Sequence, residues 1–235
     1  MSRWLVLHLD APLMSFGRGV DQNGVTEDHP SLSMMTGLVG NALGLGHGDV
    51  DALDALQARL ILACREEAIG TPLVDYQTVD LGQSFMIGTG WTTRGCPEGR
   101  EGGFSQGTHI RFRHFLGGAV FTVVLGLRDG EGPTLDDIHD ALVRPARPLF
   151  LGRKPCLPSR PLVPAGAQAW VEAATVGEAI RAASGPSRVD RPRSRRVWYP
   201  ADADGRHTLV RRDLRNWRSD THEGSRLEAM EVWDE

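Results

Sequence analysis

The sequence is poor in lysine, in cysteine and in long apolar runs. Lys154 is the only lysine among 235 residues. Arginine supplies the other permanent cations, which suits forked phosphate contacts, although genome composition would give the same bias. The three cysteines are far apart and form no CxxC pair, which argues against a disulfide framework and fits a reducing compartment. Without a charged leader or a run of about 18 apolar residues, the chain is expected to be cytoplasmic and not membrane-bound.

Signatures of common enzyme classes are missing as well. The sequence has no Walker loop, no GxSxG elbow and no Rossmann glycine fingerprint. Its eight histidines are scattered and form no HxxxH pair, so neither a metal nor another cofactor is expected. The segment GTGWTTRG at 88–95 is rich in glycine but lacks the lysine and the following helix of a phosphate loop.

The overall charge is mildly acidic. The formal net charge is −4 and the pI is about 6.1, so no global positive field attracts nucleic acid. A nucleic-acid site must therefore be local, or be completed by partner subunits.

One local site is indicated by PARPLFLGRKPCLPSRPL at 145–162. This stretch contains Arg147, Arg153, Lys154 and Arg160, no acidic residue, five prolines and one glycine. Such proline spacing excludes a long helix or an interior strand, and Gly152 permits a turn before the two adjacent cations. A stiff, extended, basic loop of this kind predicts a polyanion site, and the alternative is a solvated surface loop.

The apolar spacing before this loop predicts an α+β domain. We expect strands at 3–9, 60–68, 73–79 and 119–127, the last one central. We expect helices at about 34–43, capped by Ser33, and from a Thr134 cap to Arg144. Gly37 and Gly40 in the first helix indicate a close approach, more often by packing than by a ligand phosphate. This order of elements fits a ferredoxin-like sheet with helices on one face.

Two further segments have unusual patterns. Residues 80–107 lose all periodicity, yet interleaved apolar residues favour a protruding hairpin that packs on a partner. Residues 109–115 alternate Arg111 and Arg113 with Ile110, Phe112 and His114, so we expect one face to pack and the other to present guanidinium groups.

The chain after Pro164 gives a weaker signal. A short helix is expected at 176–183, and residues 188–218 are dominated by arginines with Trp198, Tyr199 and Trp217 among them. This arrangement suits RNA backbone neutralisation with base stacking, and it equally suits a surface making ion pairs. We place the palm domain at 1–145 and the basic loop with a smaller, irregular, β-rich region at 146–235.

Five stretches in order give the chain a family resemblance. They are DAPLMSFG (10–17), PSLSMMTGLVGNALGLG (30–46), DYQTV (75–79), FRHFLGGAVFTVVL (112–125) and PLFLGRKPCLPSRPL (148–162). From Trp4 to about Leu162 the sequence resembles the CasD family of type I-E CRISPR Cascade subunits, in the repeat-associated RNA-binding superfamily.

The resemblance implies an α+β fold with a ferredoxin-like (RRM-like) palm and an inserted β-hairpin thumb at about 80–107. Such a protein holds the 5′ handle of the crRNA, contacts the backbone subunit CasC and the large subunit CasA, and meets target DNA only indirectly. A different subunit cuts the RNA in type I-E systems, so this one is expected to be non-catalytic.

The candidate RNA-binding residues follow from this resemblance together with the chemistry of the side chains. Cations and stacking faces suit a short single strand, and the amides of Ser33 and Met34 would meet a phosphate at a helix start. The candidates are Phe16, Ser33, Met34, Tyr76, Gln77, His109, Arg111, Arg113, Arg147, Gly152, Arg153 and Lys154. The family pattern has a basic residue where Leu32 stands and a tryptophan where Phe16 stands.

The sequence also fits two other functions. A metal-independent endoribonuclease would need a base, an acid and a cation, and Tyr76, His109, His114 and Lys154 are of the right types. A pure assembly module would use its arginines and its apolar projection for protein contacts alone.

Overall fold

The computed structural model describes residues 1–17, 24–80, 89–91, 97–99, 108–187, 189, 192–201 and 208–234. The described residues form a mixed α/β structure of mostly antiparallel strands with four α-helices. Its helices are α1 (Leu32–Leu43), α2 (Val50–Arg59), α3 (Leu135–Val143) and α4 (Val176–Ala182). Its strands are β1 (Ser2–Asp10), β2 (Leu13–Met14), β3 (Phe16–Gly17), β4 (Thr26–Glu27), β5 (Leu60–Ala68), β6 (Thr71–Asp80), β7 (Thr89–Trp91), β8 (Pro97–Gly99), β9 (Thr108–Gly117), β10 (Val120–Leu127), β11 (Trp170–Ala173), β12 (Ser194–Pro200), β13 (Thr208–Asn216) and β14 (Thr221–Asp234).

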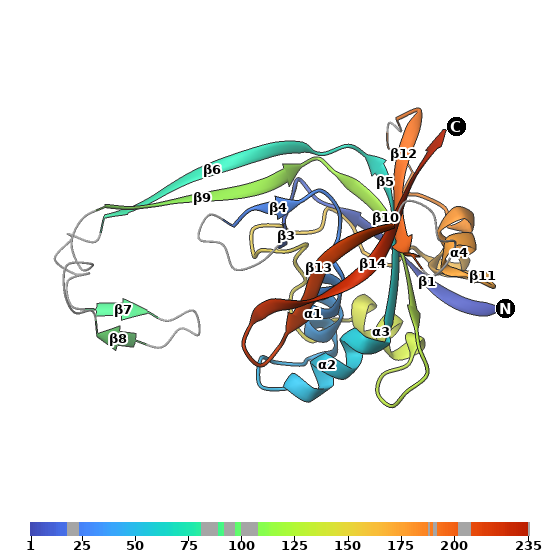
Figure 1. Cartoon of the computed structure of the whole chain (residues 1–235), viewed down its shortest axis with the longest axis horizontal. Helices are drawn as coiled ribbons and strands as arrows, with labels where there is room; N and C mark the ends of the chain where they lie inside the picture. The colour runs from blue at the N-terminus through green and yellow to red at the C-terminus, as the bar shows by residue number, and fades with distance from the viewer. Residues whose placement is uncertain are drawn as a thin grey trace.

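A seven-stranded antiparallel sheet forms the body (Figure 1), in the order β11-β1-β10-β5-β12-β14-β13. The apolar, β-branched run predicted to be a central strand is β10, which pairs with β1 and β5. The sheet contains strands from both sides of residue 145, and the domain boundary placed there stays a prediction.

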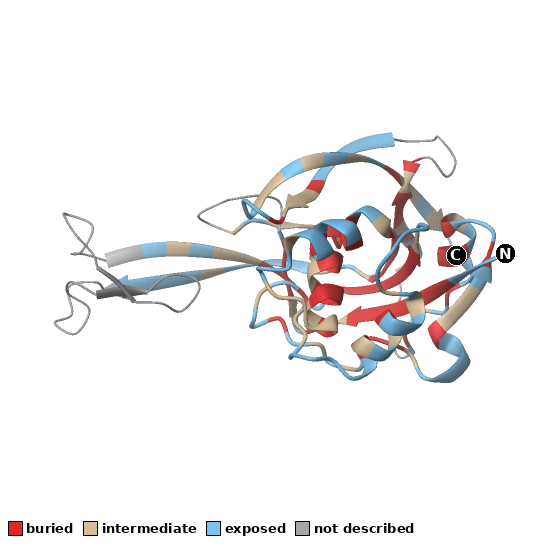
Figure 2. Ribbon diagram, turned by 90° about the horizontal axis from the view of Figure 1, so that it is seen from below, coloured by how far each residue is buried: buried red, intermediate tan, exposed pale blue. Residues whose placement is uncertain are grey.

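The core lies on both faces of this sheet. Leu5, Leu7 and Leu9 of β1 pack on the side of α1 and α3, while Trp4 and Val6 pack on the side of α4. Burial on both faces differs from the expectation of helices on one face, because α4 covers the second face. Figure 2 shows the buried strands at the centre of the sheet. No helix among the described residues is long and apolar enough to cross a membrane.

The helix predictions are confirmed with two adjustments. The Thr134 side chain accepts from the Asp137 amide in a full capping box, as expected. In α1, however, the N-cap is Ser31 rather than Ser33, and the helix starts at Leu32. A Cβ on Gly40 would lie 2.7 Å from Leu53 Cδ2 in α2, so this glycine serves helix packing.

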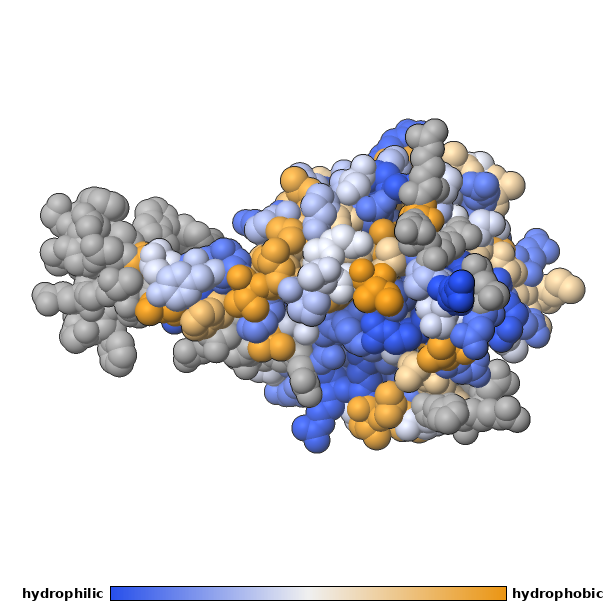
Figure 3. All heavy atoms as spheres, turned by 90° about the horizontal axis from the view of Figure 1, so that it is seen from above, coloured by the Kyte–Doolittle hydropathy of each residue, from blue (hydrophilic) through white to orange (hydrophobic). Residues whose placement is uncertain are grey.

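A long ribbon of β6 and β9 projects from the body (Figure 1). Tyr76 lies opposite Phe112 in its register, and their exposed fractions are 57% and 42%. Ile110 is exposed as well, so the prediction that this face packs is wrong within the chain, because no other described element covers it. Figure 3 shows hydrophobic residues at the surface of the ribbon. Of the predicted hairpin at 80–107, only Asp80 and the paired strands β7 and β8 are described.

The C-terminal region is more regular than predicted, since β12, β13 and β14 extend the main sheet. The short helix expected at 176–183 is confirmed as α4. Most of the described arginines between 193 and 218 bind carboxylates, so the ion-pair interpretation holds for them. Arg188, Arg191 and Arg206 lie outside the described residues. The pairs are Arg195–Glu67 (3.1 Å), Arg196–Glu66 (2.7 Å), Arg211–Glu228 (3.1 Å), Arg215–Asp220 (3.0 Å) and Arg218–Asp51 (3.2 Å).

Candidate nucleic-acid interface

A cleft of about 670 Å³ opens between α1, the basic loop and the β13–β14 hairpin. The hairpin runs along α1 toward α2 in Figure 1. Half of the candidate residues line this cleft, although they come from segments more than a hundred residues apart. These are Ser33, Met34, Arg147, Gly152, Arg153 and Lys154.

The basic loop is fixed to the segment that follows β1. Gly152 has φ +109°, and a Cβ there would lie 1.8 Å from the carbonyl oxygen of Ser15, so only glycine fits. The Ser15 amide donates to the Leu151 carbonyl (3.1 Å), and the Arg153 amide donates to Ser15 Oγ (3.1 Å). The loop therefore holds its two adjacent cations in a defined position.

The cations of this loop have different surroundings. The Arg153 guanidinium donates to the carbonyls of His114 (3.0 Å) and Gly24, which ties the loop to the base of the ribbon. Arg147 is exposed and donates to Asn41 Oδ1 (2.8 Å) and to the Leu45 carbonyl. Lys154 is exposed as well. Arg147 and Lys154 thus present positive charge at the mouth of the cleft.

The start of α1 differs from the prediction. The Met34 amide donates to Ser31 Oγ (3.1 Å), and the Leu32 amide donates to the buried carboxylate of Asp213 (2.8 Å). The Met34 amide is therefore capped within the chain and is not free to meet a phosphate, so that part of the prediction is wrong. A phosphate contact of the Ser33 amide stays a prediction. Ser33 contributes its hydroxyl, which lies 3.2 Å from His222 Nε2.

Another candidate is buried. Phe16 has no exposed surface and packs edge-on against Phe121, with ring centroids 5.7 Å apart. A base cannot stack on it, so that prediction is wrong. The apolar character of Phe16 serves the core between β3 and the main sheet.

The remaining candidates lie on the ribbon rather than in the cleft. Tyr76 meets Phe112 at 5.5 Å in a T-shaped pair, and Gln77 lies opposite Arg111. Gln77 also donates to Asp75 (2.7 Å). The side chain of His109 lies outside the described residues, and its backbone pairs with Val79.

Ribbon and cleft meet beside Gly24. A Cβ built on Gly24 would touch the guanidinium of Arg153 and would lie 3.2 Å from Arg113 Nη1. Two predicted cations from separate segments are thus close together.

Sequence reasoning did not assign three residues of the cleft wall. Arg215 and Trp217 appeared only as members of the arginine-rich segment, and His222 only as one of several scattered histidines. Burial lowers the pKa of His222, and the nearby Arg215 guanidinium lowers it further, so the imidazole is mainly neutral at pH 7. These residues could not be assigned from the sequence, because they reach the cleft only when β13 and β14 pack beside α1 in the fold.

No group of three or more His, Cys, Asp or Glu side chains within the described ranges is arranged to hold a metal. The three described residues with acid, base or cation chemistry that were considered for RNA cleavage are Tyr76, His114 and Lys154. Only Lys154 among them lines the cleft.

Fold and cleft together define an antiparallel α/β protein with a projecting ribbon and a local basic groove. The family described as CRISPR-associated protein (Cas_Cas5) matches residues 4–227. The chain belongs to this family, and the match reaches well beyond Leu162, where the resemblance in the sequence fades.

Similar proteins agree with this assignment. The CRISPR system Cascade subunit CasD of Escherichia coli (strain K12) is 28% identical over 172 residues, which span 69% of this chain and 70% of that protein. A chain of a solved CRISPR RNA-guided surveillance complex superposes with a TM-score of 0.72 at 24% identity, covering 98% of this chain and 90% of that one. A solved Cas protein gives a TM-score of 0.62 at 22% identity, over 98% and 94%. At these identities the structural likeness concerns the fold.

Proposed function

We propose that the protein is a non-catalytic RNA-binding subunit of a type I-E CRISPR surveillance complex and holds the 5′ handle of the crRNA. The observation that carries this proposal is the cleft, where Arg147, Arg153 and Lys154 line one groove of an otherwise acidic protein. A concentrated local charge suits a short single strand, whose phosphates lie close together. Membership of the CRISPR-associated family supports RNA as the anion.

The architecture supports a palm and a thumb. We propose a ferredoxin-like βαββαβ unit as the palm, and the strand order β11-β1-β10-β5 with α1 and α3 packed on one face supports this proposal. The β6–β9 ribbon would be the stem of the thumb. Its exposed Tyr76, Phe112 and Ile110 form an apolar face that favours contact with neighbouring subunits.

We propose CasC-like backbone and CasA-like large subunits as these neighbours, with target DNA met only through the guide. Such contacts would complete a site that the isolated subunit, with net charge −4, presents only locally. Cleavage is not part of this proposal. Tyr76, His114 and Lys154 are the described candidates for acid, base and cation, and only Lys154 among them lines the cleft.

The proposal predicts a salt-dependent interaction with the handle. Neutralising about three phosphates on a single strand gives a log–log slope of about −2, so affinity should fall roughly twentyfold between about 50 and 200 mM salt. Filter binding of labelled handle RNA by the complex reconstituted with its partner subunits measures this fall. A complex lacking only this subunit is the control. Equal retention of the handle without the subunit would contradict the proposal.

A further inference from the structure

The cleft wall contains buried nitrogens that lack hydrogen-bond partners. They are Arg215 Nε, Trp217 Nε1 and His222 Nδ1, and all three residues line the cleft. Buried polar atoms in folded proteins are nearly always paired, and an unpaired one costs free energy. Three such atoms on neighbouring parts of one hairpin point to a group that is supplied from outside the chain.

The chemistry of these atoms restricts what that group is. The indole Nε1 and the guanidinium Nε carry hydrogens and can only donate. His222 Nε2 is already 3.2 Å from Ser33 Oγ, which leaves Nδ1 as its unused position. A ligand that satisfies these nitrogens therefore needs at least two hydrogen-bond acceptor atoms.

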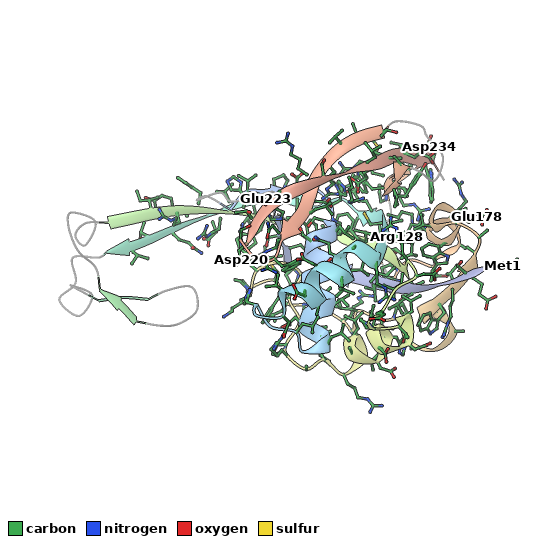
Figure 4. The ribbon with its side chains drawn as sticks, turned by 60° about the horizontal axis from the view of Figure 1, so that its bottom comes forward. Met1, Arg128, Glu178, Asp220, Glu223 and Asp234 are labelled. Atoms are coloured by element: carbon green, nitrogen blue, oxygen red, sulfur yellow. The ribbon has the colours of Figure 1, made fainter. Side chains whose placement is uncertain are left out.

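The hairpin that carries these residues is firmly placed. The main chain of Arg215 exchanges two hydrogen bonds with the Gln57 side chain of α2, at 2.9 and 3.1 Å. The Trp217 side chain lies against α1, because a Cβ on Gly37 would be 3.5 Å from Trp217 Cη2, and only 7% of Trp217 is exposed. Figure 4 shows Asp220 and Glu223 at the turn of the hairpin, and Asp220 accepts from Arg215 Nη2 (3.0 Å). These contacts fix the main chain of the hairpin beside α1 and α2.

The rest of the cleft suits a flat, partly apolar group attached to an anion. Met34, Leu38 and Phe150 line it together with Trp217, while Arg147 and Lys154 lie at its mouth. A nucleobase has a flat apolar face and ring or carbonyl acceptors at its edge, and its phosphate carries the negative charge. A peptide loop brings carbonyl acceptors too, but it does not explain the cations at the mouth.

We propose that the cleft receives one unstacked base of the bound RNA, with the acceptor edge of the base facing Trp217 and Arg215 and its phosphate near Arg147 and Lys154. The three nitrogens are covered from solvent when the cleft is empty, so these side chains rotate as the base enters. The inference rests on the proposed function and adds that the β13–β14 hairpin, rather than only the basic loop, selects the RNA.

The test is an abasic scan of the handle in the reconstituted complex. Handle RNAs that each carry a single abasic nucleotide are bound to wild type, to Trp217→Phe and to the control Trp233→Phe. Trp233 is a tryptophan of the neighbouring strand β14, and its indole nitrogen donates to Glu231 Oε2 (2.8 Å) away from the cleft. Arg215→Lys is the second variant, because it keeps the positive charge and loses the Nε donor.

We expect one abasic position to weaken wild-type and Trp233→Phe binding on the order of tenfold. At that position Trp217→Phe and Arg215→Lys should show little further loss, since the lost base was their partner. Equal losses in all four proteins at every position would overturn the base-binding cleft while leaving handle binding intact. Failure of the wild-type complex to retain the intact handle would instead refute the proposed function. If thermal unfolding shows that Trp217→Phe does not fold, the binding of the abasic RNAs by Arg215→Lys tests the base-binding cleft.

Discussion

Reversing the charges of Arg147 and Lys154 together is expected to lower the affinity of the assembled complex for handle RNA by on the order of a hundredfold. Both side chains are exposed at the mouth of the cleft, and neither is in an ion pair among the described residues. The remainder of the protein is acidic, so no distant field compensates for their loss. Filter binding with Arg147→Glu/Lys154→Glu measures the effect.

Arg153 is left unchanged in this variant, because its guanidinium supports the loop through the carbonyls of His114 and Gly24. The matched control is Arg181→Glu/Arg193→Glu, which makes the same change in net charge at exposed arginines outside the cleft. The control should bind the handle within about twofold of wild type, since neither side chain lines the cleft and salt screens exposed charges. An equal loss in both variants would mean that the cleft has no special role.

The largest effect on stability is expected from Glu67→Ala. Glu67 is fully buried on β5 and accepts from Arg65 Nε (2.8 Å), Arg195 Nη1 (3.1 Å) and Thr122 Oγ1 (2.6 Å). Removing the carboxylate leaves two buried guanidinium groups without their shared counter-ion. Breaking one side of a buried pair costs about 3–5 kcal/mol in the free energy of unfolding, which urea denaturation measures.

The acid dependence gives a second readout for Glu67. Burial alone would raise its pKa, but Arg65, Thr122 and Arg195 outweigh burial and hold the pKa below its ordinary value of 4.5. The carboxylate therefore stabilises the fold above that value, and its contribution is lost as the pH falls through the lowered pKa. Glu67→Ala should lose less stability than wild type on acidification below about pH 4.5.

Arg218→Ala is the control for Glu67→Ala, since it breaks only the exposed Arg218–Asp51 contact. It should lower the free energy of unfolding by less than about 1 kcal/mol. If Glu67→Ala and Arg218→Ala lowered the free energy of unfolding by similar amounts, the buried Glu67 cluster would not have the expected role in stability.

Local patterns predicted much of the fold. The apolar spacing of β1, the β-branched run of β10 and the capping box of α3 each depend on neighbours within a few residues. The start of α1 was misplaced by two residues, because Ser31 and Ser33 give the same local signal and only Ser31 accepts from the Met34 amide. The ribbon face was misjudged, because its alternation indicates an amphipathic strand without indicating what covers it.

The candidate site was predictable only in part. The prolines and cations of the sequence identified the basic loop. They do not show that the Arg153 guanidinium donates to backbone carbonyls, or that Phe16 is buried in the core. The glutamates that bind Arg195, Arg196 and Arg211 all lie outside the arginine-rich segment 188–218. Trp217 and His222 reach the cleft only because β13 and β14 extend the sheet past α1.

A crosslinking map of the handle RNA in the assembled complex tests the central claim most directly. With photoreactive nucleotides along the handle, the account predicts crosslinks to residues 145–154 of the basic loop and to the hairpin around Trp217 and His222. Crosslinks that fall entirely on other subunits, with both segments unlabelled, would contradict it.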